Sequence, residues 1–120
     1  MSYMPNRSKA LGTEAESAVR DYLRANGFPY ADRLTLHGTK DIGDIRLGDG
    51  IPVVIEVKGG QNAVTALGSH VDELLVEIRN AGAETGMVVA KRRRKGSPAD
   101  WFAVRPLAWD LELLKKAGYA

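Results

Sequence analysis

A chain of 120 residues has room for one domain, so we expect a single domain over residues 1–120. With 44% hydrophobic and 27% charged residues, its composition is typical of a soluble globular protein and excludes a disordered or fibrous one. The formal net charge is only +2, and no apolar run approaches the roughly 20 residues that span a bilayer. Since no secretory signal is visible either, we expect a cytoplasmic protein with no membrane partner.

Metal ligands in this sequence are limited to oxygen atoms. Cysteine is absent, which excludes disulfides, thiol catalysis and thiolate zinc sites. The two histidines, His37 and His70, are too few for a histidine-rich site. Any metal would therefore be held by carboxylates, carbonyls and water.

The first predicted element is a helix from Thr13 to Asn26. Apolar residues recur there at helical spacing, and Gly27 stands where a helix commonly ends. Thr13 and Glu16 match a capping box, so Glu16 has a structural role open to it beside a functional one.

Three segments with strand character follow: Tyr30–Leu36, Ile42–Leu47 and Pro52–Lys58. Between the second and third, Gly48-Asp49-Gly50 is a strong hairpin signal. The pattern predicts an antiparallel meander.

The second half predicts an amphipathic helix over Ala66–Ala81, ended by Gly82, with Glu77 on its polar face. Strands are expected at Gly86–Ala90 and Asp100–Val104, and a last helix at Leu107–Lys116. The order α-β-β-β-α-β-β-α indicates an α/β domain with a mixed sheet flanked by helices.

The third strand ends in Glu56-Val57-Lys58. Side chains alternate along a strand, so Glu56 and Lys58 share one face while Val57 points to the other. The hairpin brings Asp44 back toward Glu56, and two carboxylates at close range favour a divalent cation such as Mg²⁺. The alternative is a structural ion pair across the strands.

These residues carry a resemblance. Asp44 followed by Glu56-Val57-Lys58, between an acidic helix and a further helix, resembles the PD-(D/E)XK nuclease superfamily, whose fold is restriction-endonuclease-like. Residues 12–16, which read Gly-Thr-Glu-Ala-Glu, and then Gly27-Phe28, are similar to archaeal-type Holliday junction resolvases and their relatives encoded by actinobacterial phages.

The likeness to the phage group extends over nearly the whole chain, through residues 80–86, 91–93 and 100–102. Gly43 stands where the named motif has proline, and Asp41 is an alternative ligand to Asp44. The resemblance implies that Glu16, in preference to Glu14, is the first-helix carboxylate of the site.

By this resemblance the chain is a metal-dependent endonuclease of DNA recombination and repair. Asp44, Glu56 and the backbone carbonyl of Val57 would hold one Mg²⁺, for which Mn²⁺ can substitute, or Glu16 would help to hold a second ion. Lys58 would orient water or stabilise charge on the phosphate. Resolving a four-way junction needs two symmetric cuts, which implies a homodimer.

Basic residues form a candidate DNA-binding surface. The run after the fourth strand suits sequence-independent phosphate contacts, although it could be only a solvated loop. Gln61 could contact the substrate or cap the turn before it, and Trp101 and Phe102 are expected in the core. The predicted DNA contacts are Arg33, Lys40, Gln61, Lys91, Arg92, Arg93, Arg94 and Lys95.

Other functions stay open. The chain could be another structure-specific nuclease, or a repair or restriction-like nuclease of the same superfamily. It could also be a non-catalytic DNA-binding module that keeps a remnant site. A third alternative is that the basic run serves RNA or a protein partner.

Overall fold

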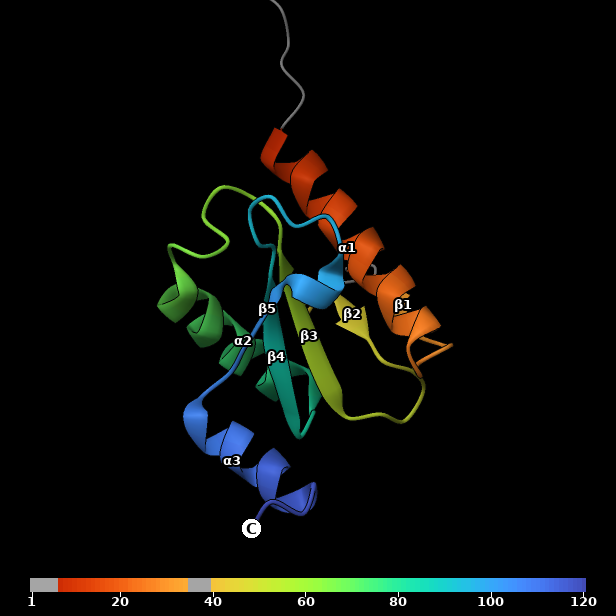
Figure 1. The fold of residues 1–120 in the computed structure, drawn as a ribbon, viewed down its shortest axis with the longest axis vertical. Coiled ribbons are helices and arrows are strands. Elements are labelled where there is room, and N and C mark those ends of the chain that lie inside the picture. Colours follow the sequence, from red (N-terminus) through yellow and green to blue (C-terminus); the bar gives the residue numbers. More distant parts are fainter. Residues whose placement is uncertain (1–6, 35–39) are drawn as a thin grey trace, which may run out of the picture.

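The computed structural model describes residues 7–34 and 40–120. Its elements follow the predicted order, with one short 3₁₀ helix added (Figure 1). They are α1 (Arg7–Ala25), β1 (Asp32–Arg33), β2 (Ile45–Arg46), β3 (Val53–Lys58), α2 (Leu67–Ala81), β4 (Thr85–Ala90), η1 (Pro98–Asp100), β5 (Phe102–Val104) and α3 (Leu107–Lys116).

The strands form one mixed sheet in the order β1-β2-β3-β4-β5. The pairs β1·β2, β2·β3 and β4·β5 are antiparallel, whereas β3 and β4 run parallel and are joined by α2. An α/β fold with a mixed sheet and an antiparallel meander is therefore confirmed.

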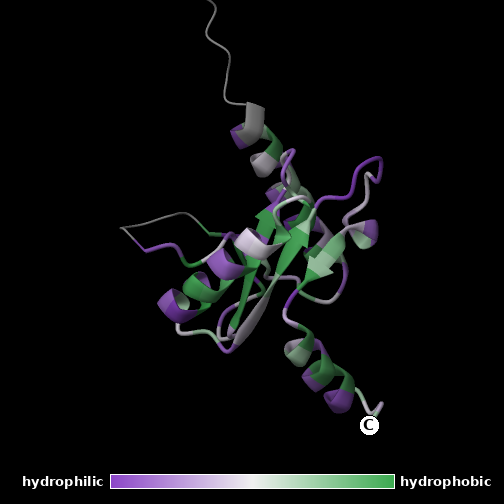
Figure 2. Ribbon diagram, turned by 90° about the vertical axis from the view of Figure 1, so that its left-hand side faces the viewer, coloured by the Kyte–Doolittle hydropathy of each residue, from purple (hydrophilic) through white to green (hydrophobic). Residues whose placement is uncertain are grey.

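Helices cover both faces of the sheet, as Figure 1 shows for α1 and α2. Val54 of β3 packs with Leu74 of α2 and Val88 of β4, while Ile55 and Val57 pack with α1. Apolar residues accordingly concentrate on the strands and polar residues on the outer sides of the helices (Figure 2). The alternation along β3 thus decides which side chains reach α2.

The first helix starts six residues earlier than predicted. Thr13 lies inside α1 and cannot be its N-cap, so the capping-box prediction is wrong. The reason is tertiary: a Cβ at Gly59 would lie 2.7 Å from the Leu11 carbonyl oxygen and 2.5 Å from the Ala15 Cβ, so α1 packs directly on the backbone after β3. Gly27, with φ of +104°, follows the helix end as predicted.

The first two strands are shorter than predicted, and residues 35–36 of the first predicted strand lie outside the described residues. Asp44 still behaves as a strand residue, because its N–H donates to the Ile55 carbonyl at 3.0 Å and its carbonyl accepts from Leu34 N–H at 2.8 Å. Gly43, with φ of +98°, interrupts the extended backbone immediately before Asp44. The chain from 40 to 44 is consequently a loop that ends at Asp44.

The C-terminal half matches its prediction closely. Helix α2 begins one residue late and ends at left-handed Gly82, and α3 has the predicted bounds. At the fifth strand, Pro98 begins η1, which replaces the expected start at Asp100. Over the part of the chain that the structure describes, no helix is long and apolar enough to cross a membrane.

Candidate active site

A polar cleft of about 310 Å³ lies at the C-terminal end of β3. Four parts of the chain build it: α1, the loop over 40–44, the end of β3 with the turn after it, and α2. Its chemically active side chains are Glu16, Asp41, Asp44, Glu56, Lys58 and Glu73. The predicted catalytic residues therefore meet in one cleft.

Asp44 is fixed against β3 by a backbone hydrogen bond. Its Oδ2 accepts from the Val57 N–H at 2.8 Å. The preceding Gly43 is required by this geometry, because its φ of +98° is closed to proline, whose φ is held near −65°. A Cβ at that position would also lie 2.5 Å from the Val54 Cγ1. The departure from the named motif is thus a consequence of the local backbone.

Glu56 and Lys58 share one face of β3, as predicted. The Lys58 Nζ lies 3.9 Å from the Glu56 Oε2 and 2.7 Å from the Glu73 Oε2 of α2. Glu56 is only 3% exposed, and Val57 is buried on the opposite face. A carboxylate and an ammonium are therefore held side by side at the floor of the cleft.

The carboxyl groups resist ionisation in this setting. Burial raises the pKa of Asp44 to about 8, and the adjoining Glu56 carboxyl adds to the effect. Burial likewise raises the pKa of Glu56 to about 8, with Glu77 contributing. Burial opposes the charged form of Lys58, but Glu73 and the other acids outweigh it, so the pKa of Lys58 is raised. The lysine is therefore a fixed cation at neutral pH.

Glu16 of α1 lines the cleft, whereas Glu14 is exposed and does not. Its Oε1 pairs with the Arg33 Nη2 at 3.4 Å. Burial and the Asp44 charge raise the pKa of Glu16 against the opposing effect of Arg33. Arg33 is thereby engaged with a site carboxylate, which differs from its predicted contact with DNA.

Sequence reasoning misplaced one acid. Glu77 of α2 is 1% exposed, so the prediction that it lies on the polar face, away from the apolar residues of the helix, is wrong. It follows the fully buried Leu74 by three residues and therefore lies on the face that packs against the sheet. Burial raises the pKa of Glu77 to about 8. Its spacing from Leu74 was the sequence signal for this position.

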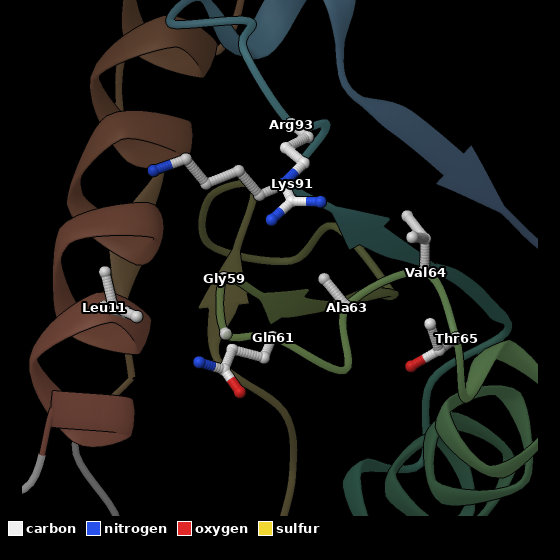
Figure 3. Close-up of a pocket in the computed structure, with 9 residues that line it drawn as sticks. Leu11, Gly59, Gln61, Ala63, Val64, Thr65, Lys91 and Arg93 are labelled. Carbon is white, nitrogen blue, oxygen red and sulfur yellow. The ribbon is translucent and has the colours of Figure 1, made fainter.

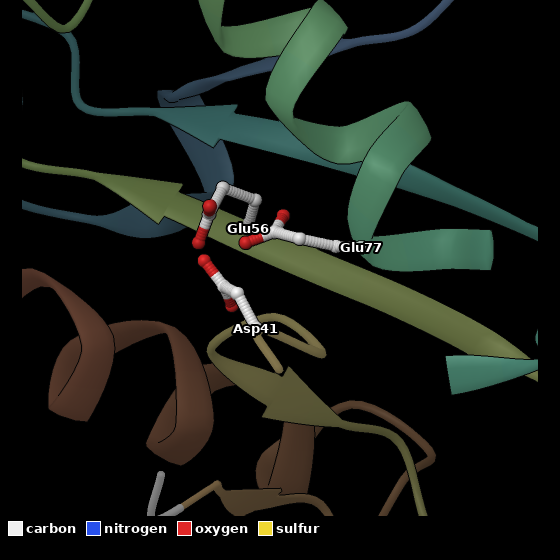
Figure 4. Close-up of side chains that lie close together, drawn as sticks. All are labelled: Asp41, Glu56 and Glu77. Atoms are coloured by element: carbon white, nitrogen blue, oxygen red, sulfur yellow. The ribbon is translucent and has the colours of Figure 1, made fainter. Parts of the chain in front are cut away.

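Asp41, offered by the sequence as an alternative to Asp44, lies beside Glu77 instead of replacing Asp44. One carboxylate oxygen from each of Asp41, Glu56 and Glu77 lies within 4.8 Å of the other two (Figure 4). The Asp41 Oδ1 accepts from the Gly43 N–H at 2.9 Å, and its carbonyl accepts from the Asn80 Nδ2 at 2.9 Å. The loop over 40–44 thus supplies two carboxylates to the cleft.

The basic run lies in the loop after β4, where residues 92–95 are exposed. The Lys91 Nζ lies 5.7 Å from the centre of the Trp101 ring, and the Arg92 guanidinium lies 5.6 Å from that of Phe102. Trp101 is 9% exposed, which confirms its place in the core. Phe102 is 42% exposed, so its core prediction is wrong.

A second cavity, of about 570 Å³, adjoins the acidic cleft, since Gly59 and Gly60 line both. Gln61, Lys91 and Arg93 surround it together with Leu11 of α1 (Figure 3). Part of the predicted basic surface therefore lines a cavity that adjoins the acidic cleft. Lys40 is exposed next to the undescribed residues 35–39.

Comparison with known proteins gives no relative: no protein-family model, no curated protein and no solved structure matches the chain. The molecule is an α/β domain with a mixed sheet and a partly buried cluster of acids around Lys58 at the end of its central strand. Its assignment to the PD-(D/E)XK superfamily stays a prediction.

Proposed function

We propose that the protein is a metal-dependent endonuclease that hydrolyses phosphodiester bonds of branched DNA, with a four-way junction as its principal substrate. The observation that carries this proposal is the placement of Asp44, Glu56 and Lys58 in one cleft at the end of β3. The carboxyl groups face each other, and the ammonium lies 3.9 Å from Glu56.

The charge balance of the cleft favours a divalent cation. Among the described residues, Lys58 and Arg33 are the cations paired with its acids, and each is engaged with a carboxylate at the rim. Six carboxyl groups surround them, and like charges in a partly dehydrated site repel unless a cation or proton intervenes. The acids are Glu16, Asp41, Asp44, Glu56, Glu73 and Glu77.

The donor set fits Mg²⁺ or Mn²⁺, which prefer oxygen ligands and retain several waters. Asp44, Glu56 and the carbonyl of Val57 would hold the ion, with Glu16 available beside them. When bound, the ion supplies an activated water and polarises the phosphate. Lys58, a fixed cation, would bind the phosphate oxygens and stabilise the negative charge that develops on them.

The second cavity offers a route for the DNA backbone. Lys91 and Arg93 line this cavity with positive charge, and Gln61 lines it with an amide group, next to the acidic cleft. A phosphate bound there would place a neighbouring linkage toward Lys58, and such contacts are independent of base sequence. The exposed residues Arg92, Arg94 and Lys95 extend the positive surface.

A homodimer would supply the two cuts that a four-way junction requires. Helix α3 leaves apolar side chains uncovered in the single chain, at the helical spacing of Leu107, Leu111 and Leu114. Leu107 is 74% exposed. We take this face of α3 as the surface for the second copy, and sedimentation of the wild type and of Leu111→Asp tests it.

Purified protein incubated with a four-way junction, a nicked duplex and a linear duplex of matched sequence tests the proposal. We expect junction cleavage in Mg²⁺ and none in EDTA. Equal cutting of all three DNAs would instead indicate a repair or restriction-like nuclease. Binding without cleavage in Mg²⁺ or Mn²⁺ would indicate a DNA-binding module. If structured RNA competes for the protein more strongly than junction DNA, the basic surface is an RNA-binding one.

A further inference from the structure

Glu77 is the most unusual buried group outside the proposed catalytic set. The residue is 1% exposed, and neither carboxylate oxygen receives a hydrogen bond from any described residue. None of the ion pairs within the described ranges includes it. A buried carboxylate without a donor is costly, so this one requires a ligand or a proton.

The Glu77 side chain is aimed at two other acids. Figure 4 shows it extending from α2 toward Glu56 of β3 and Asp41 of the loop over 40–44. One oxygen of each lies within 4.8 Å of the others. The nearby ammonium of Lys58 is directed to Glu73, at 2.7 Å, and approaches Glu56 only to 3.9 Å.

This spacing suits a hard divalent cation. All pairs of the three oxygens lie within 4.8 Å, and two oxygens bound to one Ca²⁺ by bonds of roughly 2.4 Å can be no more than about 4.8 Å apart. Bonds to Mg²⁺ are shorter, at about 2.1 Å, so to hold this ion the three oxygens must lie within about 4.2 Å of one another. Three carboxylates from three elements also match the oxygen ligation that such ions prefer.

We propose that Asp41, Glu56 and Glu77 form a second divalent-cation site, which shares Glu56 with the catalytic ion and lies on the α2 side of it. This inference rests on the proposed function for the identity of the first ion. Because Glu77 is 1% exposed, we assign this ion a structural role, while Asp41 and Glu56 connect its site to the cleft.

Its consequence is the position of Asp44. The ion would join α2 and β3 to the loop over 40–44, which the Asn80 amide already ties to α2 through the Asp41 carbonyl. Asp44 lies three residues beyond Asp41 and is anchored on the Val57 N–H. The second ion would therefore complete the clamp that holds Asp44 at the catalytic position.

Counting bound Mn²⁺ by electron paramagnetic resonance tests the site without reference to activity. We expect two ions per wild-type chain, one in Glu77→Gln and one in Asp44→Asn. Glu84→Gln is the matched control, because Glu84 is exposed and should retain both ions. Glu77→Gln should fold, and in EDTA it should melt no lower than the wild type, since it replaces a buried carboxyl group that has no hydrogen-bond donor with a neutral amide of similar shape.

Unchanged number and affinity of Mn²⁺ ions in Glu77→Gln would overturn the second site and indicate that a proton shared among the acids occupies it. A single wild-type ion lost equally in Glu77→Gln and Asp44→Asn would also overturn it. If the wild type never cuts DNA but Glu77→Gln loses an ion, the proposed function fails and the cation site stands. If cleavage is observed and Glu77→Gln keeps both ions, only the second site fails.

Discussion

Raising the pH should destabilise the metal-free protein, which is the reverse of the usual effect of carboxylates. Asp44, Glu56 and Glu77 all have pKa values raised to about 8 by burial. In the unfolded chain the same groups ionise near pH 4. Between these limits the folded state binds more protons than the unfolded state, so the stability present below about pH 4 is lost as the pH rises to about 8.

The three acids lie together and titrate as a set, so we count one retained proton. For each proton that the folded state keeps and the unfolded state has lost, the free energy of unfolding falls by about 1.4 kcal/mol per unit rise in pH. Between the ordinary glutamate value of 4.5 and about 8, the loss for this one proton is about 5 kcal/mol. This is a large part of the stability of a small domain.

Urea unfolding followed by the fluorescence of Trp101 and Trp109 measures this change at several pH values between 5 and 8. In EDTA the unfolding free energy should fall with pH, and excess Mg²⁺ should flatten the dependence because the ion replaces the protons. Glu77→Gln should reduce the slope in EDTA. Stability that rises with pH in EDTA, or a slope indifferent to Mg²⁺, would refute the reasoning.

Two further predictions concern packing and DNA binding. Gly59→Ala should lower the unfolding free energy by about 1–3 kcal/mol, since its Cβ would lie 2.5 Å from the Ala15 Cβ. Gly60→Ala is the control, because a Cβ there meets open space. Equal losses for the two variants in urea unfolding would contradict the close packing of α1 on Gly59. Changing Arg92–Arg94 to Gln should weaken binding to all DNAs alike and reduce the salt slope by about 2–3. Fluorescence anisotropy checks this, with Lys115 and Lys116 changed to Gln as the control, and loss at one sequence only would speak against phosphate contacts.

Local patterns predicted the elements best where one face of an element is apolar. Helix α2 was correct to within one residue because Gly82 ends it in the left-handed conformation. The common face of Glu56 and Lys58 followed from alternation alone. These features depend on the chain within a few residues, which the sequence displays directly.

Features set by distant parts of the chain were not predictable in this way. The start of α1 depends on its packing over Gly59, which the capping pattern at Thr13 does not encode. Glu77 is polar, yet its place three residues after Leu74 puts it against the sheet, where Asp41 and Glu56 meet it. Phe102 lies at the exposed edge strand beside Arg92, so its apolar character did not bury it.

The cleavage rate of a four-way junction by Asp44→Asn, compared with the wild type in Mg²⁺, tests the central claim most directly. The substitution keeps the side-chain oxygen that accepts from the Val57 N–H but removes the charge that would hold the ion. We predict that junction cleavage falls by at least about 100-fold while the Kd for the junction and the melting temperature change little. An unchanged cleavage rate in Asp44→Asn would contradict a metal-dependent site at the end of β3.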